Sequence, residues 1–157
     1  MSRERVRRKM RLQNRRSAQP NPRTDVILPM KHPYMSQIVS GIKNFEFRKY
    51  KISSTVKRVW FYVTAPESRI SHVWEIGPAI TRTSHDKPLP LTGMGNQEFN
   101  ERHSDWAGYD FAYEILAVHE LQTPLTLDDM KNKYGYKSAP RGLVYVIPEM
   151  IQDFSIV

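Results

Sequence analysis

Short apolar runs of strand length, separated by proline, glycine and polar turns, dominate the chain after residue 24. The clearest are residues 57–64, rich in valine and aromatic side chains, and residues 111–121, where apolar and polar side chains alternate. Such runs are typical of strands with a buried face. Most follow one another too closely for helical crossovers, so the sequence predicts a mixed or mainly antiparallel sheet.

Two helices are also expected. Pro33 suits a first helical turn, and the apolar residues after it repeat at helical spacing, which predicts a helix over residues 33–40. Thr126 and Asp129 have the spacing of a capping box, which predicts a second helix over residues 127–134. The other expected elements are strands over residues 25–30, 44–48, 57–64, 69–76, 111–121 and 143–147, and a short helix near residues 97–104.

The positive charge of the chain is concentrated at its N-terminal end. Residues 1–23 contain nine basic residues and one acidic residue, a net charge of +8, which equals the net charge of the whole chain. The remaining residues are therefore formally neutral. We expect a disordered basic tail over residues 1–23 and a single domain over residues 24–157, with a proline- and glycine-rich insertion at about residues 83–110.

Like charges packed this densely repel one another, and a phosphate backbone relieves that repulsion while releasing condensed ions. Nucleic acid is therefore one candidate partner for the tail. A nuclear-import signal, an organelle presequence and a solvated extension remain open alternatives. The candidate phosphate contacts in the tail are Arg7, Arg8, Lys9, Arg11, Arg15 and Arg16.

Several classes of protein and site are not expected. No apolar stretch approaches the ~20 residues of a membrane span. The chain has no cysteine, which excludes disulfides and thiolate chemistry. No apolar signal region follows the N-terminus, so we expect an intracellular protein of the nucleus or cytoplasm. The histidines lack metal-ligand spacing, and neither a metal nor a cofactor is expected.

Three charged residues stand together at the start of the second expected strand. On a strand, Glu46 and Arg48 point to the same face, about 7 Å apart, while Phe45 and Phe47 point to the core. Lys43 precedes the strand and can reach over the charged face. Taken alone, this pattern also fits an amphipathic strand whose polar face meets water.

The spacing Gly-x-Lys-x-x-Glu-x-Arg over residues 41–48 resembles the signature of ASCH domains, a branch of the PUA-like superfamily. Residues 59–66 after it, and Ser-Ala-Pro-Arg at residues 138–141 ahead of the last strand, also match that pattern. The resemblance covers about residues 26–147, interrupted by the expected insertion. It implies an α+β fold, a small PUA-like β-barrel of about five to six strands flanked by two or three helices.

The resemblance also implies a cleft suited to RNA, other nucleic acid or a modified nucleotide. In that cleft Lys43 and Arg48 would meet phosphate or base oxygens, and Glu46 would accept hydrogen bonds from an amino group or orient Arg48. An aromatic side chain there can stack on a base, although for each one taken singly a core position is the favoured interpretation. The further candidates for ligand contact are Tyr34, Trp60, Tyr62 and Arg141.

Two other functions stay open. Some ASCH-like proteins are amidohydrolases that act on acylated cytidine with a lysine, a threonine and a glutamate. Lys43 matches that lysine, but Glu46 stands at the threonine position, so hydrolysis would need a water activated by Glu46 beside Lys43, with these two as catalytic residues. The third function is a non-catalytic interaction module of a ribonucleoprotein or transcription coregulator. Binding is favoured over catalysis.

Overall fold

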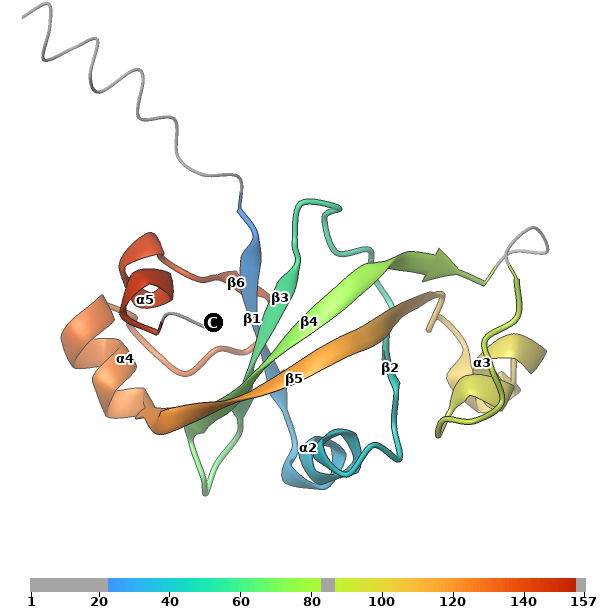
Figure 1. Cartoon of the computed structure of the whole chain (residues 1–157), viewed down its shortest axis with the longest axis horizontal. Coiled ribbons are helices and arrows are strands. Elements are labelled where there is room, and N and C mark those ends of the chain that lie inside the picture. Colours follow the sequence, from blue (N-terminus) through green and yellow to red (C-terminus); the bar gives the residue numbers. More distant parts are fainter. Residues whose placement is uncertain (1–22, 83–86, 155–157) are drawn as a thin grey trace, which may run out of the picture.

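The computed structural model of the chain describes residues 23–82 and 87–154. These residues form a curled six-stranded sheet with helices around it (Figure 1). The candidate phosphate contacts of the tail lie outside the described residues. In chain order the elements are β1 (Asp25–Met30), α2 (His32–Val39), β2 (Phe45–Arg48), β3 (Arg58–Val63), β4 (Arg69–Thr81), α3 (Asn96–Glu101), the 3-10 helix η1 (Ser104–Trp106), β5 (Phe111–Thr126), α4 (Leu127–Tyr134), β6 (Val144–Tyr145) and α5 (Pro148–Asp153).

The strands lie in the order β2-β5-β4-β3-β1-β6. β1 pairs in parallel with β3, and the other pairings are antiparallel, so the sheet is mixed as predicted. β4 and β5 are the longest strands, and their curvature closes the sheet toward a half-barrel (Figure 1). The expected α+β class, with a curled mixed sheet of six strands, is confirmed.

β4 continues through Gly77 and Pro78 to Thr81, beyond the predicted strand over residues 69–76. Its pairing with β5 shifts register between Ile76 and Ala79. Proline lacks a backbone N–H and is tolerated within a sheet at such an irregularity. The strand therefore bends at this point without ending.

The helices form where the local signals place them. At the start of α4, Asp129 N–H donates to Thr126 Oγ1 (3.1 Å), and Thr126 N–H donates to Asp129 Oδ2 (3.4 Å), which completes the predicted capping box. Gly135 ends α4 in the left-handed conformation (φ 74°). α5, at Pro148–Asp153, is an additional helix that the sequence analysis did not predict.

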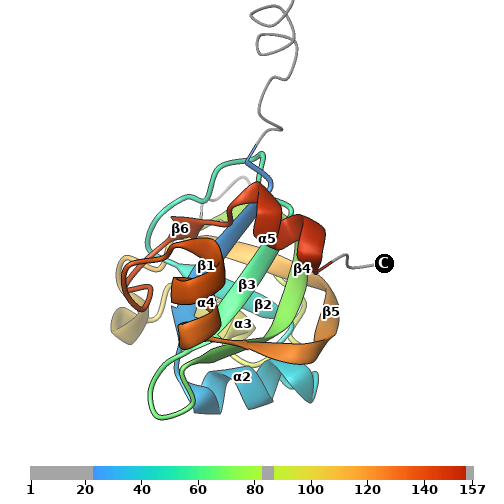
Figure 2. The ribbon, with the colours of Figure 1, turned by 90° about the vertical axis from the view of Figure 1, so that its left-hand side faces the viewer.

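Both faces of the central strands are buried. Val26 and Leu28 of β1 point to a core that α2 covers, whereas Ile27 of β1 and Trp60 and Tyr62 of β3 point to a second core under α4 and α5 (Figure 2). Trp60 and Tyr62 are fully enclosed there and expose no ring face to a ligand. The favoured core interpretation of both residues is therefore confirmed, and the alternative of base stacking is excluded for them.

A buried carboxylate ties β1 to β3. Asp25 Oδ1 accepts hydrogen bonds from Arg58 Nε (3.1 Å), Arg58 Nη2 (3.0 Å) and Thr24 Oγ1 (2.7 Å), and its Oδ2 accepts from Trp60 Nε1 (2.7 Å). The Asp25 side chain is fully buried, and these donors replace its hydration. They fix the start of β1 against the start of β3.

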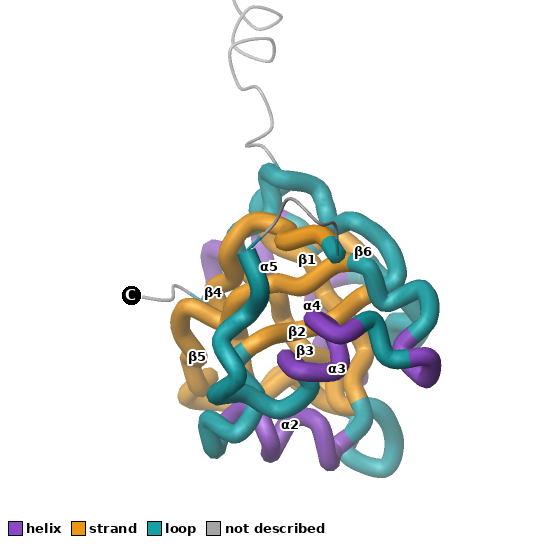
Figure 3. Tube along the Cα trace, turned by 90° about the vertical axis from the view of Figure 1, so that its right-hand side faces the viewer, coloured by secondary structure: helices purple, strands orange, loops and turns teal. Residues whose placement is uncertain are grey.

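The described part of the expected insertion, residues 87–110, packs over the β2 end of the sheet (Figure 3). Beneath it lies a third apolar cluster that includes Phe45 and Phe47 of β2 and Phe99 of α3. No helix within the described residues has the length and apolar character needed to span a membrane.

Candidate functional site

The turn between α2 and β2 positions the three charged residues of the signature. Gly41 adopts a left-handed conformation (φ 80°) after α2, and Lys43 N–H then donates to Gln37 O (3.0 Å). Strand alternation in β2 sends Phe45 and Phe47 into the third apolar cluster. The same alternation leaves Glu46 and Arg48 on the other side of the strand.

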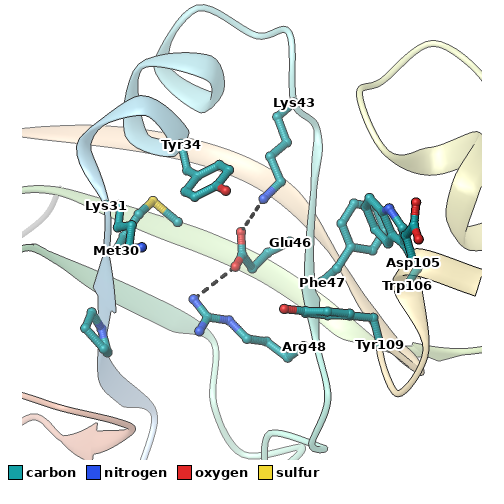
Figure 4. Close-up of a pocket in the computed structure, with 11 residues that line it drawn as sticks. Met30, Lys31, Tyr34, Lys43, Glu46, Phe47, Arg48, Asp105, Trp106 and Tyr109 are labelled. Carbon is teal, nitrogen blue, oxygen red and sulfur yellow. Dashed lines mark hydrogen bonds and ion pairs between the residues drawn. The ribbon is translucent and has the colours of Figure 1, made fainter.

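Glu46 lies between the two cations and pairs with both (Figure 4). Lys43 Nζ lies 3.0 Å from Glu46 Oε2, and Arg48 Nη2 lies 3.0 Å from Glu46 Oε1. The side chains of Lys43, Glu46 and Arg48 are only 13%, 8% and 19% exposed. These residues therefore form a recessed ion triad, unlike a pair of charges on an open surface.

The triad keeps hydrogen-bonding capacity for a further group. Arg48 Nε is buried and has no partner among the described residues. Lys43 Nζ uses one contact for Glu46 and lies 5.8 Å from the centroids of the Tyr34 and Phe47 rings, within the range of cation–π attraction. The unused N–H groups of both cations suit oxygen atoms of a ligand.

The triad lines a cavity of about 480 Å³. Its charged lining residues are three basic side chains and two acidic ones, so the cavity carries a formal charge of +1. Its volume lies within the range of sites for small ligands, which is ~300–1,000 Å³. The lining residues are Pro29, Met30, Lys31, Tyr34, Lys43, Glu46, Phe47, Arg48, Asp105, Trp106 and Tyr109.

Residues from segment 87–110 form one wall of the cavity. Trp106 packs edge-on against Phe47, with ring centroids 4.9 Å apart and an interplanar angle of 78°. Arg82 holds the backbone behind this wall, because its Nη1 donates to Trp106 O (3.0 Å) and its Nε donates to Phe99 O (2.9 Å). Trp106 and Tyr109 are only partly buried, and both line the cavity.

Gly95 is required for this wall to close on β2. It has a φ of +86°, and a Cβ at this position would lie 2.5 Å from Trp106 Cη2 and 3.0 Å from Phe47 Cε2. Only glycine has both the left-handed backbone and the space for this approach. The position of Trp106 therefore depends on the absence of a side chain at Gly95.

Comparison with protein-family models finds no match for the chain, and comparison with curated proteins finds none either. Among solved structures, the ASCH protein of Zymomonas mobilis superposes with a TM-score of 0.57 at 20% sequence identity, covering 83% of this chain and 92% of that one. A serine-to-alanine variant of the same protein superposes with a TM-score of 0.59 at 19% identity, over 85% of this chain and 95% of that one. The chain has an ASCH fold. The resemblance read from residues 41–48 is thus confirmed at the level of the fold.

Within this ASCH fold, the predicted site residues divide into two groups. Lys43, Glu46, Arg48 and Tyr34 all line the cavity, with Tyr34 on the α2 side (Figure 4). Arg141 is exposed in the loop before β6 and does not line it. The roles of all five in binding stay predictions.

The sequence analysis missed the aromatic wall of the ASCH-fold cavity. Trp106 and Tyr109 stand in a polar segment rich in glycine and proline, where an isolated aromatic residue has no strand or helix periodicity to assign it. Their presence in such a segment was the available signal. Lys31, the residue after β1, was also missed as a lining residue.

No metal site emerges from the described part of the chain, where no three histidine, aspartate or glutamate side chains gather closely enough to hold an ion. Asp105 N–H donates to His103 Nδ1 (3.2 Å) at the start of η1. This contact caps a turn of 3-10 helix. The proximity of His103 and Asp105 therefore has a local structural explanation.

Proposed function

We propose that this ASCH-fold protein binds single-stranded nucleic acid, RNA in the first place, by holding one nucleotide in the cavity beside Lys43, Glu46 and Arg48. The observation that carries the proposal is the recessed ion triad at a cavity of nucleotide size. The basic tail adds contacts to phosphates outside the cavity.

The energetics of the triad favour recognition over a structural role. Burying charges costs solvation, and a buried ion pair is on average no better for stability than apolar side chains of similar volume. The same desolvation strengthens hydrogen bonds to a ligand. Lys43 and Arg48 offer donors to phosphate or base oxygens, and Glu46 offers acceptors to an exocyclic amino group.

Aromatic side chains on two sides of the cavity suit a base. Tyr34 is 50% exposed, and Trp106 and Tyr109 present partly open rings across from it (Figure 4). Stacking of one base on one aromatic ring contributes ~1–3 kcal/mol. A nucleotide can therefore place its base against the aromatic wall and its polar groups against the triad.

The same geometry supports binding over hydrolysis. A water that acts as nucleophile needs a free acceptor to take its proton. Both oxygens of Glu46 are engaged, one with Lys43 and one with Arg48. A water can still bind the remaining lone pairs of Glu46, but transfer of its proton would neutralise the carboxylate between two cations and weaken both 3.0 Å ion pairs.

The proposal is tested by fluorescence anisotropy with a labelled single-stranded RNA and the double variant Lys43→Met/Arg48→Gln. Charge-assisted hydrogen bonds contribute ~1.5–3 kcal/mol each, so affinity should fall at least about tenfold. The matched control is Lys131→Met/Arg69→Gln, which removes the same charges from exposed positions away from the cavity. Equal affinity of the two variants would contradict the proposal and favour an interaction module.

The tail has a separate test. Eight basic residues precede Arg23, and each phosphate contact on a single strand contributes ~0.7 to the slope of log affinity against log salt concentration. Deletion of residues 2–22 should therefore flatten that slope by several units. An unchanged slope would exclude the tail from the interface.

A further inference from the structure

The loop between β2 and β3 carries a concentration of positive charge outside the cavity. Residues 48–58, Arg-Lys-Tyr-Lys-Ile-Ser-Ser-Thr-Val-Lys-Arg, contain five basic residues and no acidic one. Lys49, Lys51 and Lys57 are exposed, and none of the three pairs with an acidic side chain within the described residues. Residues 24–157 are formally neutral as a whole, so the rest of the domain carries a net charge of −5 and this loop is a local exception.

One end of the loop meets the rim of the cavity. Lys49 directly follows Arg48 of the triad, and its Nζ lies 5.0 Å from the centroid of the Tyr109 ring in the aromatic wall. Tyr50, the next residue, is 42% exposed and offers a ring to solvent. A nucleic-acid chain that leaves the cavity on the Arg48 side therefore first meets the Lys49 ammonium group and the Tyr50 ring.

The other end of the loop meets the base of the tail. Thr55 Oγ1 donates to Arg23 O (2.8 Å), and Lys57 N–H donates to Thr24 O (2.7 Å). Figure 1 shows the loop crossing from the end of β2 to the start of β3, beside the point where the chain enters β1. The loop thus joins the cavity to the place where the basic tail begins.

The domain holds this loop in place. Ile52 N–H donates to Tyr113 Oη (2.6 Å), and Val56 N–H donates to Ser53 O (3.0 Å). The side chains of Ile52 and Val56 are buried in the core that α2 covers. Lys49, Lys51 and Lys57 therefore extend from an anchored backbone, which reduces the entropy lost when they bind a ligand.

We propose that residues 49–57 form the track on which the phosphodiester backbone of a single-stranded nucleic acid runs from the cavity to the basic tail. The inference rests on the proposed function. Lys49, Lys51 and Lys57 contact successive phosphates, and Tyr50 stacks on a base that has left the cavity. RNA and single-stranded DNA share this backbone chemistry.

The test uses the full chain and the triple variant Lys49→Gln/Lys51→Gln/Lys57→Gln. Its probes are labelled oligouridylate and oligothymidylate of about 16 nucleotides, the upper end of site sizes for single-strand-binding barrels. Three lost contacts at ~0.7 each should reduce the log–log salt slope by about two units. The matched control, Lys131→Gln/Lys133→Gln/Lys137→Gln, removes three exposed lysines near α4 and should leave the slope unchanged.

A second variant, Lys51→Glu, adds one repulsive charge to the loop and should weaken binding of the 16-nucleotide probes at low salt. A wild-type salt slope in the triple variant, or an equal loss of slope in the triple variant and its control, would contradict the proposed track. If these slopes stay unchanged while Lys43→Met/Arg48→Gln abolishes binding, the track alone fails. If Lys43→Met/Arg48→Gln binds as the wild type does, the proposed function fails. A loss on oligouridylate alone assigns the track to RNA.

Discussion

Gly95 and Gly135 offer a matched pair of substitutions that measures how tightly the aromatic wall closes on β2. Both residues have a left-handed backbone, with φ of +86° and +74°. An alanine at either position pays ~1–2 kcal/mol for that conformation. A Cβ at Gly135 has no atom within 4 Å, whereas a Cβ at Gly95 would lie 2.5 Å from Trp106 Cη2.

We therefore expect different losses of stability. Gly135→Ala should lower the free energy of unfolding by ~1–2 kcal/mol, from backbone strain alone. Gly95→Ala must also displace Trp106 or Phe47, and overpacking of this kind costs a further ~1–3 kcal/mol. Its total loss should be ~2–5 kcal/mol. The measurement is urea-induced unfolding, followed by circular dichroism for both variants and the wild type.

Binding provides the second measurement. Gly95→Ala should weaken RNA binding because it moves Trp106 in the wall of the cavity, whereas Gly135→Ala, at the end of α4, should not. Equal losses of stability in the two variants would refute the reasoning, since they would mean that Trp106 does not pack on the backbone at Gly95.

Three further predictions concern buried or engaged polar groups. Asp25→Ala removes the carboxylate that pairs with Arg58 inside the sheet, and should lower the free energy of unfolding in urea by ~3–5 kcal/mol; a loss near zero would contradict this. Burial, with the hydrogen bond from Tyr134 Oη to Asp153, raises the pKa of Tyr134 to about 12, above the value near 10 of an unfolded chain. The unfolded state therefore releases this proton first, so stability should fall as the pH rises from about 10 to about 12, and Tyr134→Phe should fall less steeply over that range. Wild-type protein incubated with acylated cytidine should release no acid above the buffer rate, because proton transfer from water to Glu46 would weaken its ion pairs with Lys43 and Arg48; release that Glu46→Gln abolishes would establish hydrolysis instead.

Periodicity and capping predicted much of the fold because they are local signals. The capping box of Thr126 and Asp129 and the alternation in residues 45–48 each depend on a few neighbouring residues, and the structure has both. The position of Trp60 depends on distant parts of the chain. Trp60 is buried because α4 and α5 cover the second face of β3, and α5 was not predicted. Without that cover, an aromatic residue on β3 has an open face.

The site, like the fold, was predictable only where its geometry depends on neighbouring residues. The spacing of Lys43, Glu46 and Arg48 placed three charges on one side of β2, because strand alternation and a short turn suffice for that. The far wall was not predictable, since Trp106 reaches the cavity only through the packing of segment 87–110 on Phe47. A side chain that comes from a distant segment of the chain produces no spacing pattern near the residues that it contacts in the fold.

The parallel pairing of β1 with β3 has a consequence for the length of a ligand. Met30, at one end of β1, lines the cavity, and Asp25, at the other end, follows the base of the tail. Five residue steps of ~3.3 Å separate them by about 16 Å, and β1 pairs with β3 along its whole length. Oligonucleotides too short to bridge this gap engage one region or the other. An oligonucleotide longer than this gap can contact both the cavity and the tail region, and the second of these contacts is then intramolecular. Affinity plotted against the number of nucleotides should therefore rise in a step, at a length set by β1.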